Sequence, residues 1–199
     1  MSEFWNEKYK GSNYLYGTEA NEFLKLELLK LHPGSILLPA EGEGRNGIFA
    51  ALNNWKVTAF DVSEVGREKA LELAKRNKVS INYMLQGYDE IDFPENSFDA
   101  IGLTFCHLPP KLRKIMHQKY ITWLKPGGYI LLEAFSKEQL QYNSGGPKDI
   151  DMLFSEAQLR ADFEELTDIH TSTLLTELNE GDGHRGKASV IRLVGKKFK

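Results

Sequence analysis

The sequence of 199 residues contains very little cysteine, with Cys106 alone. A single thiol excludes an intrachain disulfide framework and any zinc site built from several cysteines. No apolar run approaches the ~20 residues that a membrane-spanning helix requires. Residues 1–7, MSEFWNE, have neither the basic nor the apolar stretch of a secretion signal. We therefore expect a protein of the reducing cytoplasm that has no membrane partner.

Excess positive charge and paired histidines are also missing. The 25 Lys and Arg residues are outnumbered by 28 Asp and Glu residues, for a net charge of −3, which argues against a broad nucleic-acid-binding surface. None of the five histidines forms an H-x-x-H or H-x-x-x-H pair, so we expect no metal site. With 41% hydrophobic residues, the chain can bury a sizeable core. We expect residues 1–199 to form a single domain. The protein is expected to be a monomer or weak homodimer and to act on a small-molecule substrate.

Short apolar runs alternate with helical patterns along most of the chain. This order predicts an α/β fold with a doubly wound, mostly parallel sheet. The expected helices are 18–31, 45–53, 63–76, 110–124 and a short one from 155, and the expected strands are 36–39, 56–60, 80–85, 98–104, 129–135, 164–178 and 187–196. The last two strands are joined by the turn 179–186, and such a hairpin requires one antiparallel strand. The prediction is a seven-stranded sheet with a C-terminal antiparallel hairpin.

The segments that say most about function are 35–47, SILLPAEGEGRNG, and 57–61, VTAFD. An apolar run ends in a Gly-rich turn, a helical pattern follows, and a second apolar run ends in Asp61. Gly42, Gly44 and Gly47 let the backbone come close to a ligand, and Asp61 can accept hydrogen bonds from both ribose hydroxyls. This pattern is typical of an α/β sheet that binds an adenosine-bearing ligand.

The charge of the turn separates two candidate ligands. Residues 42–47 satisfy the G-x-G-x-x-G pattern of dinucleotide-binding proteins, which is weak evidence by itself. A dinucleotide places its anionic pyrophosphate at the N-terminus of the following helix, where Glu41 and Glu43 would repel it. S-adenosylmethionine carries a cationic sulfonium and a cationic ammonium, which suit a carboxylate-rich turn. The alternative is that both Glu side chains point into water.

Several short segments occur in a specific order and spacing: FWNEKY at 4–9, YG at 16–17, AEGEGRN at 40–46, DVS at 61–63, NSFD at 96–99, LKPGG at 124–128 and EAF at 133–135. In these segments the chain resembles class I S-adenosylmethionine-dependent methyltransferases, and in particular the small tellurite-resistance and thiopurine-methyltransferase-like group. The resemblance covers nearly the whole chain. It implies a Rossmann-like methyltransferase fold with S-adenosyl-L-methionine as the cofactor.

The resemblance also implies roles for individual positions. The cofactor's methionine part is expected to contact the turn formed by Ala40, Glu41, Gly42, Glu43, Gly44, Arg45 and Asn46. Its ribose is expected to bind Asp61, and its adenine to lie beside Val62, Ser63, Gly87, Tyr88 and Asp89. Thr104 and Phe105 lie where the family approaches the methyl-bearing sulfur. Two positions depart from the family pattern: Leu38 stands where an acidic residue is common, and Ala40 where the first glycine of the turn is usual.

Methyl transfer from a sulfonium is an in-line displacement, so alignment is the main task of the protein and can supply ~7–11 kcal/mol of the barrier. A base need only remove a proton. His107, which follows the fourth expected strand, is the first candidate for a substrate-facing base or hydrogen-bond donor; an imidazole that bonds a backbone carbonyl before Pro109 is the competing interpretation. His184 and Arg185, in the expected last turn, are candidates for gripping an oxyanion or small acid, and a solvated hairpin tip is their alternative.

The aromatic residues near the N-terminus, Phe4, Trp5, Tyr9, Tyr14 and Tyr16, have two interpretations. They can pack the first helix onto the domain. By resemblance, residues 1–31 form a helical lid over the sulfonium, and Tyr9 or Tyr16 steadies its charge through a cation–π contact. Residues 142–149 form a polar loop that we expect to cover the substrate. Cys106 is either a nucleophile or, more commonly for a lone thiol, a small buried apolar residue.

Taken together, the sequence predicts S-adenosylmethionine-dependent methyl transfer to a small-molecule acceptor. Three other functions stay open. A related sulfonium transferase would keep the same pocket and move an aminopropyl or carboxyl-derived group instead of a methyl group. An NAD-dependent oxidoreductase would need its pyrophosphate beside Glu41 and Glu43. A non-catalytic cofactor-binding partner of a larger enzyme would bind the cofactor without turnover.

Overall fold

The computed structural model describes residues 2–198. Helices and strands alternate along the chain as the sequence predicts. In chain order they are α1 (Ser2–Tyr9), α2 (Glu22–Leu28), β1 (Ser35–Pro39), α3 (Arg45–Leu52), β2 (Lys56–Asp61), α4 (Glu64–Arg76), β3 (Asn82–Leu85), β4 (Phe98–Thr104), α5 (Pro110–Trp123), β5 (Leu124–Phe135), the 3₁₀ turns η1 (Lys137–Gln141) and η2 (Ile150–Met152), α6 (Glu156–Asp162), β6 (Leu166–Glu180) and β7 (His184–Lys197).

The strands form a seven-stranded sheet in the order β3-β2-β1-β4-β5-β7-β6. Strands β1, β2 and β3 pair in parallel, as do β4 and β5, whereas β7 pairs antiparallel with β5. This confirms the predicted fold class: a mostly parallel α/β sheet that ends in an antiparallel hairpin. The chain divides into two compact units, residues 2–91 with 180–183, and residues 92–179 with 184–198.

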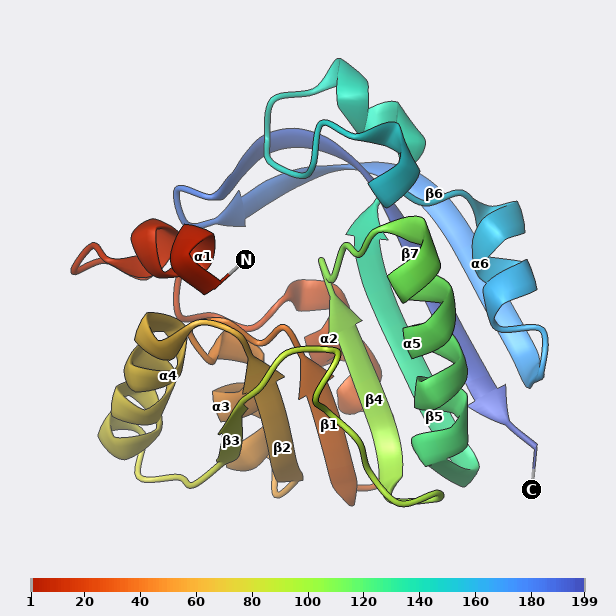
Figure 1. The fold of residues 1–199 in the computed structure, drawn as a ribbon, viewed down its shortest axis with the longest axis horizontal. Helices are drawn as coiled ribbons and strands as arrows, with labels where there is room; N and C mark the ends of the chain where they lie inside the picture. The colour runs from red at the N-terminus through yellow and green to blue at the C-terminus, as the bar shows by residue number, and fades with distance from the viewer. Residues whose placement is uncertain (1, 199) are drawn as a thin grey trace. The chain divides into compact units, whose positions relative to one another are not determined.

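The first unit is built on β1, β2 and β3, with α3 and α4 packed against these strands (Figure 1). Nearly every residue of β1 is buried, as expected for a parallel strand covered on both faces. In the register, Pro39 faces Phe60 and Asp61 faces Leu85, so β1 and β2 end at the same edge. The turn after β1 and the carboxylate at the end of β2 therefore lie side by side.

The second unit contains β4, β5, β7 and β6, with α5 packed against β5 and α6. Its hydrophobic core includes Phe135, Leu153, Ala188 and Val190. The predicted polar loop 142–149 lies between η1 and η2 and is attached to β7, because the Ser144 hydroxyl donates to the Lys187 carbonyl at 2.8 Å. Its expected role as a substrate cover stays a prediction.

Side-chain caps explain where two helices begin. The Ser63 hydroxyl accepts from the Gly66 N–H at 3.0 Å and starts α4 as predicted. The predicted helix 18–31 is shorter in the structure, since the Asn21 side chain caps α2 by accepting from the Leu24 N–H at 3.0 Å. A cap whose oxygen satisfies a first-turn N–H fixes the start of a helix more firmly than an apolar stripe does.

The C-terminal hairpin also differs from its prediction. Strands β6 and β7 extend to Glu180 and from His184, so the connecting turn is 181–183 rather than 179–186. The three glycines at 181, 183 and 186 favour a longer loop, but Gly186 lies within β7 with a left-handed φ of 103°. His184 is therefore a strand residue. No helix within residues 2–198 is long and apolar enough to cross a membrane.

Candidate functional site

The turn after β1 follows a left-handed path that fits few side chains. Ala40, Gly42 and Gly44 have φ values of 51°, 59° and 93°, a region that costs a residue with a Cβ roughly 1–2 kcal/mol. A Cβ on Gly44 would lie 2.8 Å from the Cα of Ala70 on α4. Gly44 is thus required by both its φ and this close approach, whereas Ala40 accepts the strain at a position where the family commonly has glycine.

Asp61 joins this turn to the end of β2. Its Oδ2 accepts from the Gly42 N–H at 3.0 Å and its Oδ1 accepts from the Ser63 N–H at 2.9 Å. Burial raises the pKa of the Asp61 carboxyl, while the N–H groups of Ser63, Gly42 and Val62 oppose that shift. A carboxylate keeps lone pairs beyond those already used, so both oxygens can still accept hydroxyl donors.

Gln86 is a site residue that the sequence did not point out. Its N–H donates to the Asp61 carbonyl at 3.1 Å, which places it directly beside the end of β2. The side-chain Oε1 is buried and has no hydrogen-bond partner among residues 2–198. A buried acceptor without a donor is costly, and an adenine amino group supplies such a donor. This orphaned oxygen fits a nucleoside beside Asp61; its place directly before Gly87 was the available sequence signal.

The residues after Gln86 also lie at this end of β2. The Tyr88 ring packs edge-on against Phe60 with centroids 5.3 Å apart. A Cβ on Gly87 would lie 2.6 Å from Oδ1 of Asp89, so the carboxylate rests against the glycine. Val62 lies 3.6 Å from the same Cβ position. Val62, Gly87, Tyr88 and Asp89 therefore lie at this end of β2, and their expected contact with adenine stays a prediction.

The two glutamates of the turn do not face a ligand as bare charges, and this corrects the prediction that they would. Glu43 Oε1 lies 2.5 Å from the Lys69 Nζ, and Oε2 accepts from the Leu15 N–H at 2.7 Å. Glu41 Oε1 accepts from the Gly47 N–H at 2.7 Å. Burial raises the pKa of Glu41 to about 7 against the opposing effect of that N–H. Both carboxylates are used to build the turn.

Arg45 and Asn46 likewise hold neighbouring segments. The Arg45 guanidinium donates to Glu180 Oε2 at 2.9 Å and to the Tyr16 carbonyl at 3.3 Å. Asn46 Oδ1 accepts from the Asn21 N–H at 2.9 Å. The turn at 181–183 is thus attached to the N-terminal segment and to the start of α3. Any direct contact of Arg45 or Asn46 with a cofactor stays a prediction.

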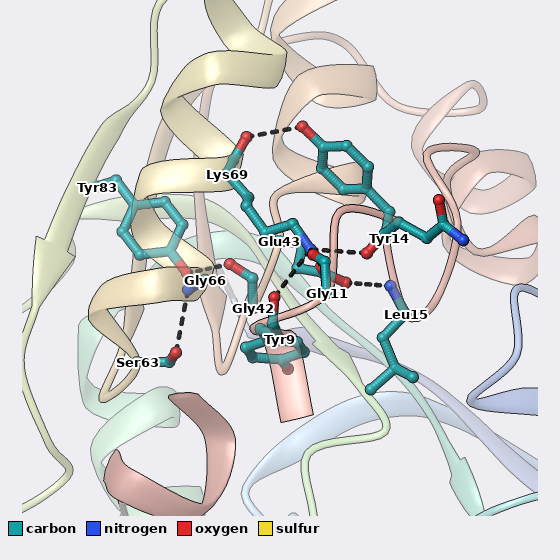
Figure 2. A network of polar contacts seen from close by, with 11 residues as sticks. Tyr9, Gly11, Tyr14, Leu15, Gly42, Glu43, Ser63, Gly66, Lys69 and Tyr83 are labelled. Carbon is teal, nitrogen blue, oxygen red and sulfur yellow. Dashed lines mark hydrogen bonds and ion pairs between the residues drawn. The ribbon is translucent and has the colours of Figure 1, made fainter. Parts of the chain in front are cut away.

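Tyr9, near the N-terminus, lies against the Gly-rich turn (Figure 2). Tyr9 is 5% exposed, and a Cβ on Gly42 would lie 2.6 Å from its hydroxyl oxygen. Trp5 stacks on Tyr9 with centroids 5.4 Å apart, and Tyr16 meets Tyr9 edge-on at 6.4 Å. From β3, the Tyr83 hydroxyl donates to the Gly42 carbonyl at 2.6 Å. The Tyr9 ring therefore covers the turn at Gly42, and the Tyr83 hydroxyl holds the Gly42 carbonyl in place.

In the second unit, Thr104 ends β4 and Phe105 follows it with a left-handed φ of 48°. The Phe105 N–H donates to the Glu133 carbonyl at 2.7 Å, which holds this strained conformation. Its ring packs on Phe135 and His184, with centroids 4.6 and 4.3 Å apart. The next residue, Cys106, is buried, in accord with the apolar interpretation of the lone thiol.

His107 does not have the free nitrogen that a substrate-facing base needs. Nδ1 donates to the Met152 carbonyl at 2.7 Å, and Nε2 accepts from the Phe135 N–H at 3.2 Å. Burial lowers the pKa of His107 to about 4, so the ring is neutral. The prediction of His107 as the base is therefore wrong for this structure, and the competing interpretation, an imidazole that shapes the turn through a backbone carbonyl, is the one observed.

His184 and Arg185 do not form a joint grip for an anion. Both lie at the start of β7, where successive side chains point to opposite faces. His184 is 5% exposed, whereas Arg185 is exposed. The predicted pair is therefore separated by the strand pleat. No cluster of three or more potential metal-ligating side chains occurs in residues 2–198.

Comparison with known proteins gives this arrangement a family context. Residues 36–128 match a family model described as a methyltransferase domain. The match covers slightly less than half of the 199 residues. The matched range contains the Gly-rich turn, Asp61 and Gln86, and it ends at Gly128, within β5.

Two curated relatives are both methyltransferases. Over 122 residues the chain is 29% identical to phosphoethanolamine N-methyltransferase 3 of Arabidopsis thaliana, an alignment that covers 56% of this chain and 23% of that protein. Over 100 residues it is 31% identical to the ubiquinone/menaquinone biosynthesis C-methyltransferase UbiE of Vibrio cholerae, covering 50% of this chain and 35% of that protein. The alignments thus span only about a quarter to a third of these relatives.

Solved structures show the same fold over most of the chain. An S-adenosylmethionine-dependent methyltransferase of Methanosarcina mazei aligns with a TM-score of 0.70 and 18% identity, covering 90% of this chain and 99% of that one. TehB of Haemophilus influenzae aligns with a TM-score of 0.70 and 20% identity, covering 98% of this chain and 66% of that one. At such identities the likeness concerns the fold alone, and it agrees with the Rossmann-like sheet described above.

Proposed function

We propose that this protein is an S-adenosylmethionine-dependent methyltransferase that acts on a small-molecule acceptor. The observation that carries the proposal is the Asp61 carboxylate, which bonds the Gly42 N–H and joins the Gly-rich turn to the end of β2 at 3.0 Å. The ligands of such sheets bind outside the carboxyl ends of the strands. The methyltransferase-domain match over residues 36–128 covers this arrangement.

The residues of the first unit suit the parts of that cofactor. Asp61 would accept the ribose hydroxyls, and the orphaned Gln86 Oε1 would accept from the adenine amino group. The left-handed turn at Gly42 would bring the backbone close to the methionine part. The bound cofactor supplies an electrophilic methyl group on a sulfonium, so the protein has to align the acceptor and exclude water rather than provide a catalytic triad.

The geometry of α3 supports the sulfonium cofactor over a dinucleotide. A pyrophosphate binds free N–H groups in the first helical turn. Here the Gly47 N–H in the first turn of α3 already donates to Glu41 Oε1 at 2.7 Å. A dinucleotide would therefore have to displace a buried carboxyl, whereas a ligand without phosphate would not.

The acceptor is proposed from the relatives and from the resemblance. The relatives named above methylate, by their names, phosphoethanolamine and a ubiquinone or menaquinone precursor. The N-terminal segments FWNEKY and YG resemble those of the tellurite-resistance and thiopurine-methyltransferase-like group, and TehB shares the fold over 98% of this chain. We infer a small-molecule acceptor, for which an oxyanion such as tellurite, a thiol and a small amine are the candidates.

A thermal-shift experiment tests the cofactor assignment. At 100 times its Kd, S-adenosylhomocysteine should stabilise the fold by ~2.7 kcal/mol, which raises the Tm by roughly 5–10 °C. NAD should leave the Tm unchanged. Asp61→Ala should abolish the shift, and Asp92→Ala, which removes an exposed carboxylate, should keep it. Stabilisation by NAD and none by S-adenosylhomocysteine would show that the protein is an oxidoreductase-type binder instead.

Transfer itself is tested with S-adenosylmethionine labelled in the methyl group. Tellurite, an aromatic thiol and phosphoethanolamine serve as acceptors, and label in the product is measured together with released S-adenosylhomocysteine. We expect acceptor-dependent release with at least one of them. Tight cofactor binding with no transfer to any acceptor would favour the non-catalytic partner.

A further inference from the structure

The ammonium group of Lys69 on α4 bonds acceptors in two segments that are distant from it in the sequence. The Lys69 side chain is 13% exposed. The Nζ donates to the carbonyl oxygens of Tyr9, Gly11 and Asn13 at 3.0, 2.8 and 2.7 Å, and it lies 2.5 Å from Glu43 Oε1 (Figure 2). An ammonium has three hydrogens and no acceptor. One side chain thus satisfies three main-chain carbonyls at the end of α1 and just after it, and neutralises a buried carboxylate of the Gly-rich turn.

Further contacts complete the attachment of residues 9–15. The Leu15 N–H donates to Glu43 Oε2 at 2.7 Å. The Tyr14 hydroxyl donates to the Lys69 carbonyl at 3.1 Å, and the Lys69 Nζ lies 5.1 Å from the Tyr14 ring centroid. Glu43 and Lys69 therefore hold the same segment from two sides, so the position of this segment depends on the pair.

This attachment sets where Tyr9 lies. Tyr9 is the last residue of α1, and its own carbonyl is one of the Lys69 acceptors. The Tyr9 ring contacts both Gly42 and Gly66, where added Cβ atoms would lie 2.6 Å from its hydroxyl oxygen and 3.1 Å from a ring carbon. Under the proposed function, the cofactor approaches the turn at Gly42. The segment that Lys69 anchors is therefore the cover of that part of the site.

We propose that Lys69 is a positioning residue that holds α1 and Tyr9 closed over the Gly-rich turn and thereby controls how fast the cofactor exchanges. The proposal rests on the proposed function. Without the ammonium, Glu43 becomes an unpaired buried charge and three carbonyls lose their donor, which favours a conformation in which residues 2–16 leave the turn. Arg at position 69 keeps the charge but changes the donor geometry.

The test compares Lys69→Met, Lys69→Arg and Lys75→Met. Lys75 is exposed on the same helix, so its variant is the matched control. In Lys69→Met, amide hydrogens of residues 2–16 should exchange at least about tenfold faster in the ligand-free protein, and S-adenosylhomocysteine should dissociate at least about tenfold faster, because several charge-assisted hydrogen bonds are lost. The KM for S-adenosylmethionine should rise more than kcat falls. Lys69→Arg should recover part of each effect, and Lys75→Met should match the wild type.

Each outcome decides the proposal. Unchanged exchange of residues 2–16 in Lys69→Met would overturn the anchoring role, and faster exchange with an unchanged dissociation rate would overturn control of the cofactor. If Lys69→Met does not fold, Glu43→Gln replaces it, since it removes the charge of the partner at constant size and should act in the same direction. If wild-type protein binds no S-adenosylhomocysteine, the proposed function fails, and the exchange measurement on ligand-free protein still decides the anchoring.

Discussion

At the residue scale, the buried acidic side chains of the first unit are bonded to backbone N–H groups. Asp61 bonds Gly42 and Ser63, Glu41 bonds Gly47, and Glu43 bonds Leu15. A carboxyl oxygen that accepts a main-chain N–H fixes the path of the chain there. The Gly-rich turn is thus held in its strained path before any ligand arrives, which lowers the entropy that ordering it on binding would cost.

A first prediction at this scale concerns His107. Replacement by Asn should lower the free energy of unfolding by about 2–4 kcal/mol, because the Met152 carbonyl and the Phe135 N–H lose their partner, the buried His107 ring. Urea denaturation at pH 7 measures this, with His170→Asn as an exposed control. A His107→Asn protein with wild-type stability and no methyl transfer would restore His107 as a base.

At the scale of elements, the start of α3 depends on close approach to α4. Gly44 is the N-cap of α3 and has no side chain to cap with. Its backbone lies so close to Ala70 that the two helices can meet only where a Cβ is missing. The same turn is attached to residues 180–183 through the ion pair of Arg45 with Glu180. The Gly-rich turn is therefore positioned by a helix and by a hairpin tip.

A second prediction follows for Gly44. Gly44→Ala should destabilise the fold by about 2–4 kcal/mol, the sum of a left-handed φ of 93° and a Cβ 2.6 Å from that of Ala70. Gly11→Ala is the matched control, because a Cβ there meets nothing within 4 Å. Urea denaturation of both variants checks the difference. Equal stability of the two variants would contradict the close packing of α3 on α4.

A third prediction concerns the attachment of the hairpin tip. A double-mutant cycle of Arg45→Met and Glu180→Gln should give a coupling free energy of about 1.5–3 kcal/mol, since both side chains are largely buried and bond at 2.9 Å. The exposed pair of Arg76 with Glu72 serves as the comparison, and its coupling should stay near 0.5 kcal/mol or less. A coupling at Arg45 no larger than that of the exposed pair would show that the tip is held by packing alone.

At the scale of the whole molecule, two buried groups set opposite pH dependences of stability. Burial raises the pKa of Glu41 from 4.5 to about 7 and lowers that of His107 from 6.5 to about 4. Protonated Glu41 therefore contributes stability that is complete below pH 4.5 and is lost as the pH rises to about 7. Neutral His107 contributes stability that is complete above pH 6.5 and is lost as the pH falls to about 4.

A fourth prediction separates the two groups. The wild type should show little change between pH 4.5 and 6.5, where the two slopes oppose each other. Glu41→Gln should remove the loss between pH 4.5 and 7, which is at most about 3 kcal/mol. His107→Asn should remove the loss of stability at low pH and leave only the loss that Glu41 causes between pH 4.5 and 7. Urea denaturation from pH 4 to 8 measures all three profiles, and a Glu41→Gln profile parallel to the wild type would contradict the raised pKa of Glu41.

Local patterns determined much of this protein. The short apolar runs, the helical patterns between them and the closing hairpin each depend on a few neighbouring residues, so the sheet and its antiparallel end could be predicted from the sequence. The same holds for the Gly-rich turn and Asp61, because parallel strands bring their carboxyl ends to one edge whatever the side-chain details. The start of α2 and the length of the last turn could not be predicted, since the Asn21 cap begins α2 later and Gly186 lies within β7 rather than in the turn.

Only the tertiary structure decided which charged and polar groups meet. Lys69 on α4 reads as one of several lysines on a surface helix, yet it bonds carbonyls of residues 9, 11 and 13, far away along the chain. From the sequence, Glu43 is expected to face a ligand with its charge, but in the structure Lys69 neutralises that charge. The physical reason is the sequence distance over which each feature is determined. Apolar runs and turns depend on residues that are close in the sequence. The charge state of a buried ionisable group depends on partners that only folding brings within 3 Å.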